Sequence, residues 1–219
     1  PEEVFAWTRN PADAPDEPAY LEIEFERGIP VALNGEALDG VVLIDRLNRI
    51  AGEHGVGRID HIEDRVVGIK SREVYEAPAA TVLITAHQDL EQITLSKDQL
   101  RFKALVSQAY AEMVYSGLWY SAFHQDLAAY IQSSQRFVNG TVRVKLHKGT
   151  CRVVGRKSPN PLYSFALATY DRADQFDHSA AVGFIKLWGL QTQVQAQTQF
   201  LAQPEAAQSL LPPRAEAEE

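Results

Sequence analysis

The stretch GTVRVKLHKGTCRVVGR, residues 140–156, carries the clearest fold signal in this sequence. Apolar and basic residues alternate over 142–146, and a period of two is typical of a strand with one buried face. Lys148-Gly149 marks a turn, and apolar residues return over 151–153. The stretch therefore predicts a β-hairpin of two antiparallel strands.

A second strand pattern lies near the start of the chain. Over residues 21–26, apolar residues alternate with three glutamates. Gly28 and Pro30 break this run, and a short run at 29–33 then meets the turn signal Asn34-Gly35. These patterns predict two further strands.

Apolar residues at helical spacing predict most of the remaining regular structure. The predicted helices cover residues 39–53 and 79–95, the segments Phe102 to Met113 and Phe123 to Phe137, and residues 179–200. Strands and helices neither alternate strictly nor separate into blocks, so the predicted class is α+β. We expect an antiparallel sheet packed with helices, and an extended helix near the C-terminus.

Composition divides the chain into four predicted parts. Residues 1–19 contain four prolines among acidic residues, which predicts a linker or an extended arm. Residues 20–178 form the main domain, and residues 179–200 form a C-terminal helix. The tail, 201–219, is rich in Ala, Gln, Glu and Pro and is predicted to be disordered.

Charge and composition exclude several classes of protein. The formal net charge of -8 and the isoelectric point of about 5.3 argue against binding to nucleic acids or anionic membranes. No apolar run is long enough for a transmembrane helix, and no signal-peptide pattern opens the sequence. A single cysteine, Cys151, cannot form an intrachain disulfide, so a reducing, cytoplasmic setting fits. The start at Pro1 suggests a processed or partial chain.

Familiar nucleotide and metal motifs do not occur. The sequence contains neither G-x-x-x-x-G-K-[ST] nor G-x-G-x-x-G after a strand. Gly55-Val-Gly57-Arg58 resembles a fragment of a phosphate loop, but a helix end followed by a turn into a strand is the favoured interpretation. The six histidines lack metal-ligand spacing, so no metal site is predicted.

The segment 54–78, HGVGRIDHIEDRVVGIKSREVYEAP, concentrates charged side chains between glycines and short β-branched runs. Segments of this kind most often form solvated surface or local ion pairs. The interruptions, however, place the charges at strand ends and loops, where binding groups are frequent. A glutamate and a tyrosine would suit a zwitterionic amino acid, since a carboxylate pairs with its ammonium group and a hydroxyl offers a hydrogen bond.

The same segment closely resembles the one written HGVGRIDIVENRxVGxKSRGVYETP in argininosuccinate synthases. The matching positions are 54–60, Glu63, Arg65, 68–72 and 74–76. Further blocks match that family in the same order, at 14–18, 21–31, 110–119, 140–146, 148–149, 154–159, 162–163 and 183–190. The resemblance extends from residue 1 to about 195 and implies the C-terminal half of that enzyme, with residues 20–178 as its synthetase domain.

This resemblance implies which residues bind substrate. In the family, the glutamate at the position of Glu63 faces the α-ammonium group of citrulline, and the tyrosine at the position of Tyr75 also contacts citrulline. Arg58, Lys70 and Arg72 match motif positions and are candidate supporting residues. No catalytic residue and no metal ligand is implied in this chain.

The resemblance also implies a reaction and partners. The complete enzyme joins citrulline and aspartate with ATP through a citrullyl-adenylate, giving argininosuccinate, AMP and pyrophosphate in arginine biosynthesis. ATP, with Mg²⁺, and aspartate are held by a nucleotide-binding half whose loop SGGLDTS does not occur in this sequence. We therefore expect this chain to be inactive alone and to belong to a cytoplasmic homotetramer joined by C-terminal helices.

Three departures from the family pattern lie close to Tyr75. Glu73 stands where the family usually has glycine, Ala77 replaces threonine, and Ala79-Ala80 replaces a glycine-rich stretch. A glutamate at position 73 would require a different backbone conformation if φ were positive there.

A second hypothesis is a non-catalytic oligomerisation or amino-acid-binding module. The helix at 179–200 either reaches across a partner subunit or packs on the chain's own core. The sequence leaves both arrangements open.

Overall fold

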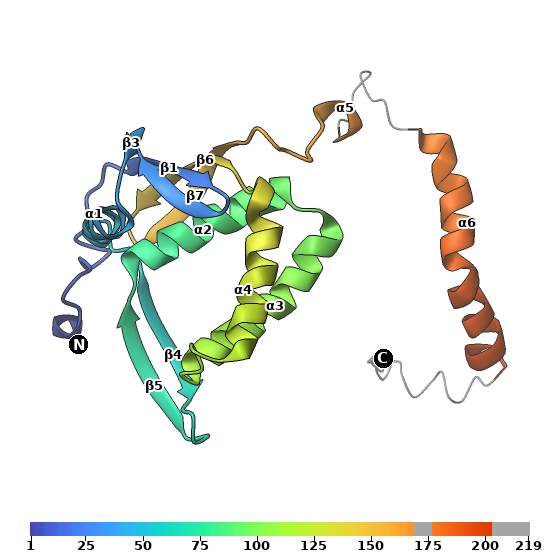
Figure 1. The fold of residues 1–219 in the computed structure, drawn as a ribbon, viewed down its shortest axis with the longest axis horizontal. Helices are drawn as coiled ribbons and strands as arrows, with labels where there is room; N and C mark the ends of the chain where they lie inside the picture. The colour runs from blue at the N-terminus through green and yellow to red at the C-terminus, as the bar shows by residue number, and fades with distance from the viewer. Residues whose placement is uncertain (169–176, 203–219) are drawn as a thin grey trace, which may run out of the picture. The chain divides into compact units, whose positions relative to one another are not determined.

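The computed structural model describes residues 1–168 and 177–202 (Figure 1). The chain divides into two compact units, Pro1–Tyr163 and a second that begins at Ser164, and each is described by itself. The tail that was predicted to be disordered lies outside the described residues from position 203 onward.

Unit 1, Pro1–Tyr163, is built on a five-stranded antiparallel sheet with the strand order β3-β2-β1-β6-β7. Its strands are β1 (Ala19–Glu26), β2 (Ile29–Leu33), β3 (Glu36–Ala37), β6 (Gly140–His147) and β7 (Thr150–Lys157). β6 and β7 form the hairpin predicted from residues 140–156. Ile23 of β1 pairs with Val142 of β6, so the first strand of the unit lies beside one of its last. The predicted α+β class is confirmed.

Tight turns connect the neighbouring strands of this sheet. Arg27-Gly28, Asn34-Gly35 and Lys148-Gly149 each have positive φ at both positions, 51° and 78°, 53° and 77°, and 43° and 82°. Type I′ turns require this combination, and their twist matches that of the flanking strands. The break expected at Gly28 is therefore a hairpin turn inside the sheet.

Four helices make up most of the rest of unit 1: α1 (Gly40–Glu53), α2 (Pro78–Thr94), α3 (Lys97–Tyr115) and α4 (Ala122–Ser134). The side chains of Asp39, Ser96 and Ser121 cap α1, α3 and α4 by accepting a hydrogen bond from the first turn. α2 instead has Pro78 in its first turn, where a missing N–H is tolerated. Three short helices are Glu2–Val4, Gln135–Phe137 and, in the second unit, α5 (Phe165–Ala168).

The main core lies between the sheet, α1 and α2. Its fully buried apolar side chains come from all three: Ile23, Leu43, Leu47, Val82, Leu90, Val142, Val144 and Leu146. α3 and α4 pack against each other around a smaller cluster of Val106, Met113 and Leu127. The alternating pattern at 142–146 thus buries one face of β6, as expected from the sequence.

A second, two-stranded sheet projects from this body (Figure 1). It consists of β4 (Arg58–Asp64) and β5 (Lys70–Glu76), which pair along their full length without a register shift. The Arg65 amide donates to the Ile69 carbonyl at 3.0 Å, and Gly68 adopts a φ of 80° in the connecting turn. We call this element the β4–β5 hairpin. Gly55-Val-Gly57-Arg58 follows the end of α1 and leads through a turn into β4, so the favoured interpretation of this stretch is confirmed.

The N-terminal arm, residues 1–18, is fastened to the base of the β4–β5 hairpin by Glu76. Its carboxylate accepts hydrogen bonds from the backbone amides of Ala6 at 2.8 Å, Trp7 at 3.0 Å and Thr8 at 2.7 Å, and from the Thr8 hydroxyl at 2.6 Å. Burial raises the pKa of Glu76, but these hydrogen bonds together outweigh burial and lower it. Thr8 is buried, so the arm is part of the packed body here.

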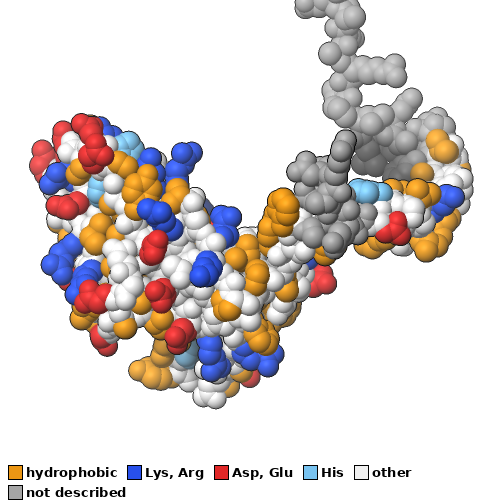
Figure 2. Space-filling model, turned by 90° about the horizontal axis from the view of Figure 1, so that it is seen from above, with side chains coloured by type: hydrophobic (Ala, Val, Ile, Leu, Met, Phe, Trp, Pro, Cys, Tyr) orange, Lys and Arg blue, Asp and Glu red, His pale blue; other side chains and the backbone are white. Residues whose placement is uncertain are grey.

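Acidic and basic side chains are intermixed on the face of unit 1 seen in Figure 2. Unit 1 contains several ion pairs: Lys148 contacts Asp16 at 2.6 Å, and Arg156 forms an ion pair with Asp89. Exposed pairs of this kind contribute little to stability individually.

The second unit contains the predicted C-terminal helix. This helix, α6 (His178–Gln195), begins after Asp177, whose side chain caps it, and continues as a π-helical turn at Ala196–Phe200. α6 buries none of its side chains, and even its large apolar residues Leu187 and Trp188 are 73% and 76% exposed. Neither α6 nor any other helix in residues 1–168 and 177–202 has the length and hydrophobicity needed to cross a membrane.

Candidate functional site

The β4–β5 hairpin presents two chemically different faces. Because side chains alternate along paired strands, the register places residues 59, 61 and 63 of β4 beside residues 75, 73 and 71 of β5 on one face. We call this the Glu63 face. Residues 58, 60, 62 and 64 share the opposite face with residues 76, 74, 72 and 70, and we call this the ion-pair face.

Glu63 and Tyr75, the two predicted citrulline contacts, meet on the Glu63 face. The Tyr75 hydroxyl donates to Oε2 of Glu63 at 3.2 Å, and the His61 ring lies 3.4 Å from the same oxygen. The side chain of Glu63 is 22% exposed. A carboxylate that is reachable from solvent and held by a neutral donor can accept further hydrogen bonds through its remaining lone pairs.

A second tyrosine reaches the same carboxylate from a different element. Tyr115, the last residue of α3, donates to Oε1 of Glu63 at 3.2 Å and lies 3.1 Å from the Asp64 carbonyl. Desolvation, and then the charge of Glu63, raise the pKa of both Tyr75 and Tyr115. Both hydroxyls therefore keep their protons at neutral pH and remain hydrogen-bond donors to Glu63.

Tyr115 was not predicted to be a site residue. It belongs to the block 110–119 that resembles the family, but no role was attached to it. Its contact with Glu63 spans 52 residues and depends on how α3 is placed beside the β4–β5 hairpin. No periodicity or local motif could have indicated this contact.

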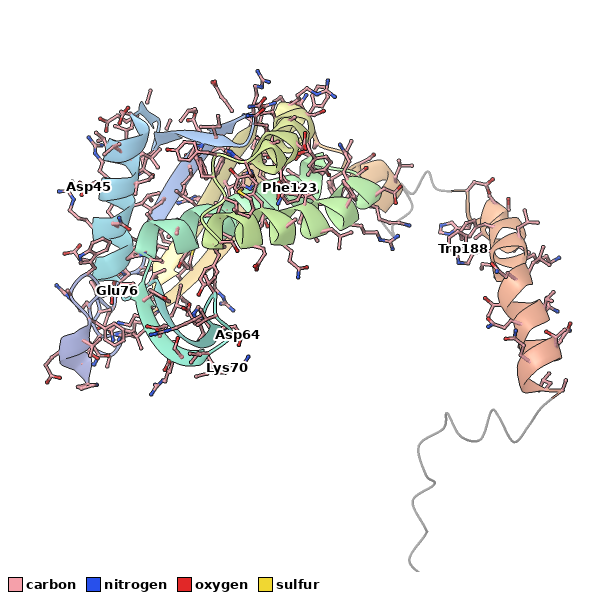
Figure 3. All side chains as sticks on the ribbon, turned by 60° about the horizontal axis from the view of Figure 1, so that its bottom comes forward. Asp45, Asp64, Lys70, Glu76, Phe123 and Trp188 are labelled. Atoms are coloured by element: carbon pink, nitrogen blue, oxygen red, sulfur yellow. The ribbon has the colours of Figure 1, made fainter. Side chains whose placement is uncertain are left out.

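The three candidate supporting residues, Arg58, Lys70 and Arg72, lie on the ion-pair face. Lys70 contacts Asp64 at 2.7 Å near the tip of the hairpin (Figure 3), and Arg72 contacts Asp60 at 2.5 Å. The structure does not bring either side chain to Glu63. The Arg72 guanidinium, by donating to Asp60, lowers the pKa of that carboxyl.

Arg58 is part of the junction with the N-terminal arm. It forms an ion pair with Glu2 at 2.6 Å and donates to the Thr8 carbonyl at 2.7 Å. Its guanidinium also lies 3.8 Å from the centre of the Phe5 ring. Glu76 lies at the same end of the hairpin (Figure 3), so this end is fixed to the body by contacts from several groups.

The three departures from the family pattern fit without strain. Glu73 lies inside β5 opposite His61, does not have a positive φ, and faces Arg65 at 3.6 Å. Ala77 occupies the N-cap position of α2 with a φ of -137°. Ala79 is buried, and its amide donates to the Asn48 side chain at 2.9 Å.

Within the part of the chain that the structure describes, three or more His, Cys, Asp or Glu side chains never gather as they would around a metal ion. Among the described residues, two tyrosine hydroxyls and one imidazole contact the Glu63 carboxylate, and Glu73 lies on the same face of the hairpin, paired with Arg65.

Comparison with known proteins places this chain in a family. The sequence profile described as Arginosuccinate synthase C-terminal domain matches residues 1–195. This chain belongs to the argininosuccinate synthase C-terminal domain family. The match covers unit 1 and α6 entirely.

Curated relatives in bacteria carry the name argininosuccinate synthase. A protein of Dehalococcoides mccartyi is 64% identical over 203 residues, which are 93% of this chain and 50% of that protein. A protein of Symbiobacterium thermophilum is 62% identical over 199 residues, 91% of this chain and 50% of the relative. The chain spans about half the length of the curated relatives it matches and corresponds to the C-terminal half of the family's enzyme.

Proposed function

We propose that this chain forms one wall of the citrulline site of an argininosuccinate synthase. The observation that carries the proposal is the Glu63 carboxylate, held at 3.2 Å by both Tyr75 and Tyr115 on one face of a projecting hairpin. The complete enzyme joins citrulline to aspartate with ATP through a citrullyl-adenylate, releasing pyrophosphate and AMP. ATP with Mg²⁺ and aspartate are bound by the other half of the enzyme, which also supplies the catalytic groups.

The charges of the Glu63 face suit the α-ammonium group of an amino acid. Glu63 supplies one negative charge, and the two tyrosines hold it without adding a positive charge that would compete with the ligand. Hydrogen bonds between an ammonium group and a carboxylate are among the stronger ones in proteins. Glu63 is mostly shielded from solvent, so screening of this attraction is reduced.

In this proposal the ion-pair face stabilises the hairpin and does not contact citrulline. Lys70 and Arg72 pair with carboxylates of the opposite strand and so help to keep the register of the hairpin fixed. Arg58 ties the base of the hairpin to Glu2 of the N-terminal arm. Ligase chemistry of this kind depends on holding two substrates in the reactive geometry. A rigid hairpin would hold citrulline in place while the other half activates its ureido oxygen.

Steady-state kinetics of the complete enzyme tests the citrulline assignment. Glu63→Gln keeps the size of the side chain and removes its charge, and we expect the KM for citrulline to rise by about tenfold or more, with the KM for ATP unchanged. The control is Asp60→Asn, which removes a carboxylate from the ion-pair face of the same strand. Equal increases in both KM values for Glu63→Gln would contradict the assignment.

The isolated chain provides a second test. A protein of residues 1–219 should show no citrulline-dependent exchange between ATP and pyrophosphate, because the nucleotide-binding groups lie in the other half. Mixing it with that half, supplied as a separate protein, should restore exchange. Exchange by the isolated chain would contradict the assignment of the nucleotide-binding groups to the other half.

The alternative function, an oligomerisation module, is supported by α6. Val182, Ile185, Leu187, Trp188 and Leu190 are all more than half exposed on this helix. We propose that these side chains join subunits in a cytoplasmic homotetramer. Light scattering should show a smaller particle for Trp188→Asp than for wild type, whereas Gln191→Asp, a polar control on the same helix, should leave the mass unchanged. An unchanged mass for Trp188→Asp would contradict the assignment.

A further inference from the structure

Tyr115 connects the end of α3 with β4. Its backbone belongs to the last turn of α3, while its hydroxyl lies against β4. The helix stops immediately after it, where Gly117 adopts a φ of 72°. The end of α3 therefore sets the position of Tyr115. The contact between Tyr115 and β4 in turn fixes Glu63 relative to α3.

The Tyr115 hydroxyl fixes the carboxylate relative to the strand that bears it. It lies 3.2 Å from Oε1 of Glu63 and 3.1 Å from the backbone carbonyl of Asp64, the next residue. One phenolic proton is shared between these two acceptors. Tyr75 holds the other oxygen, Oε2, so the carboxylate is held from both ends and its rotation is restricted.

Such a carboxylate needs less reorganisation when a cation arrives. A free glutamate side chain loses rotamer freedom on binding, and a side chain that is held in advance loses less. Tyr75 alone leaves Oε1 without a donor from the described residues, and rotation about the last side-chain bond then becomes possible.

We propose that Tyr115 is a positioning residue that orients Glu63 toward the ammonium group of citrulline. This inference rests on the proposed function of Glu63. Tyr115 acts through Glu63 and needs no contact with the substrate. Its effect is therefore confined to ligands that carry the ammonium group.

The test is Tyr115→Phe in the complete enzyme, a change that keeps the ring and removes the hydroxyl. We expect the KM for citrulline to rise about tenfold, as for the loss of one hydrogen bond to a charged group. The KM values for ATP and aspartate and the melting temperature should stay at wild-type values. Tyr120→Phe is the matched control, because Tyr120 is 97% exposed and its hydroxyl has no described partner.

Two further measurements separate positioning from a structural role. In a Glu63→Gln background, adding Tyr115→Phe should raise the KM for citrulline by less than about twofold, because the group being positioned is already altered. Inhibition by 5-ureidopentanoate, which is citrulline without its ammonium group, should be the same for wild type and Tyr115→Phe.

Three results would overturn the inference: a citrulline KM within twofold of wild type for Tyr115→Phe, equal losses for all three substrates, or weaker inhibition by 5-ureidopentanoate. If Glu63→Gln also leaves the citrulline KM unchanged, the proposed function fails together with the inference. If Glu63→Gln raises it and Tyr115→Phe does not, only the inference fails.

Discussion

Replacing Glu76 with alanine removes the carboxylate that the amides of Ala6, Trp7 and Thr8 and the Thr8 hydroxyl share. A net hydrogen bond contributes about 0.5–1.5 kcal/mol. The amides of Ala6 and Trp7 lie near solvent, where water can replace the lost acceptor, so the lower half of that range applies. Four donors at about 0.5–1 kcal/mol each give a loss of about 2–4 kcal/mol in the unfolding free energy of unit 1.

Urea unfolding followed by far-UV circular dichroism measures this loss. With a slope of about 2 kcal/mol per molar urea, the midpoint for Glu76→Ala should fall by about 1–2 M. Glu36→Ala is the control, because the Glu36 carboxylate pairs with Arg46 at the surface and is 58% exposed. The control should lose less than about 1 kcal/mol.

The pH dependence follows from the lowered pKa of Glu76 in the folded protein. Its contribution to stability is complete above the unfolded-state pKa, about 4.3, and disappears as the pH falls through the lower folded-state pKa. The difference between wild type and Glu76→Ala should therefore be full at pH 7 and shrink below about pH 4. A difference that does not change with pH, or one no larger than that of Glu36→Ala, would refute this account.

Two further predictions concern backbone strain and the single thiol. Gly57 has a φ of 103°, and a Cβ there would lie 2.5 Å from the backbone of Pro78, whereas Gly35, with a φ of 77°, has open space around it. Thermal unfolding should therefore show a loss of about 1–2 kcal/mol for Gly35→Ala and a clearly larger loss for Gly57→Ala; equal losses would contradict the close approach. Burial raises the pKa of Cys151 to about 11. The native thiol should react with Ellman's reagent at pH 8 roughly a hundredfold more slowly than in urea, and rates within threefold of each other would show that the thiol is accessible.

Most of the sheet and the helices could be predicted because their signals are local. β6 buries one face, so its apolar residues alternate over 142–146, and the Lys148-Gly149 turn follows directly. Apolar spacing predicted the starts of α1 and α4 to within one residue, whereas the predicted segment for α3 began at Phe102 and the helix begins at Lys97. In each case the deciding contacts lie within a few residues of one another.

The β4–β5 hairpin was not predicted as a hairpin, because it buries neither face. Ile62 is 62% exposed, and charged side chains occupy both faces, so no alternation of polar and apolar residues marks the strands. Glu63 and Tyr75 were found only through resemblance to a family. Tyr115 joins them through the packing of α3 beside the hairpin, and a single sequence does not encode that contact in any local pattern.

The two faces of the β4–β5 hairpin have a consequence for comparing relatives. The connection between the strands, residues 65–69, can change in length while Glu63 and Tyr75 still meet, provided that each strand keeps its pairing. One residue inserted within β4 between Arg58 and Glu63, by contrast, would exchange odd and even positions and turn the carboxylate toward the opposite side. Odd or even position along each strand, rather than the number of residues between Glu63 and Tyr75, is what an evolving or engineered version of this hairpin has to preserve.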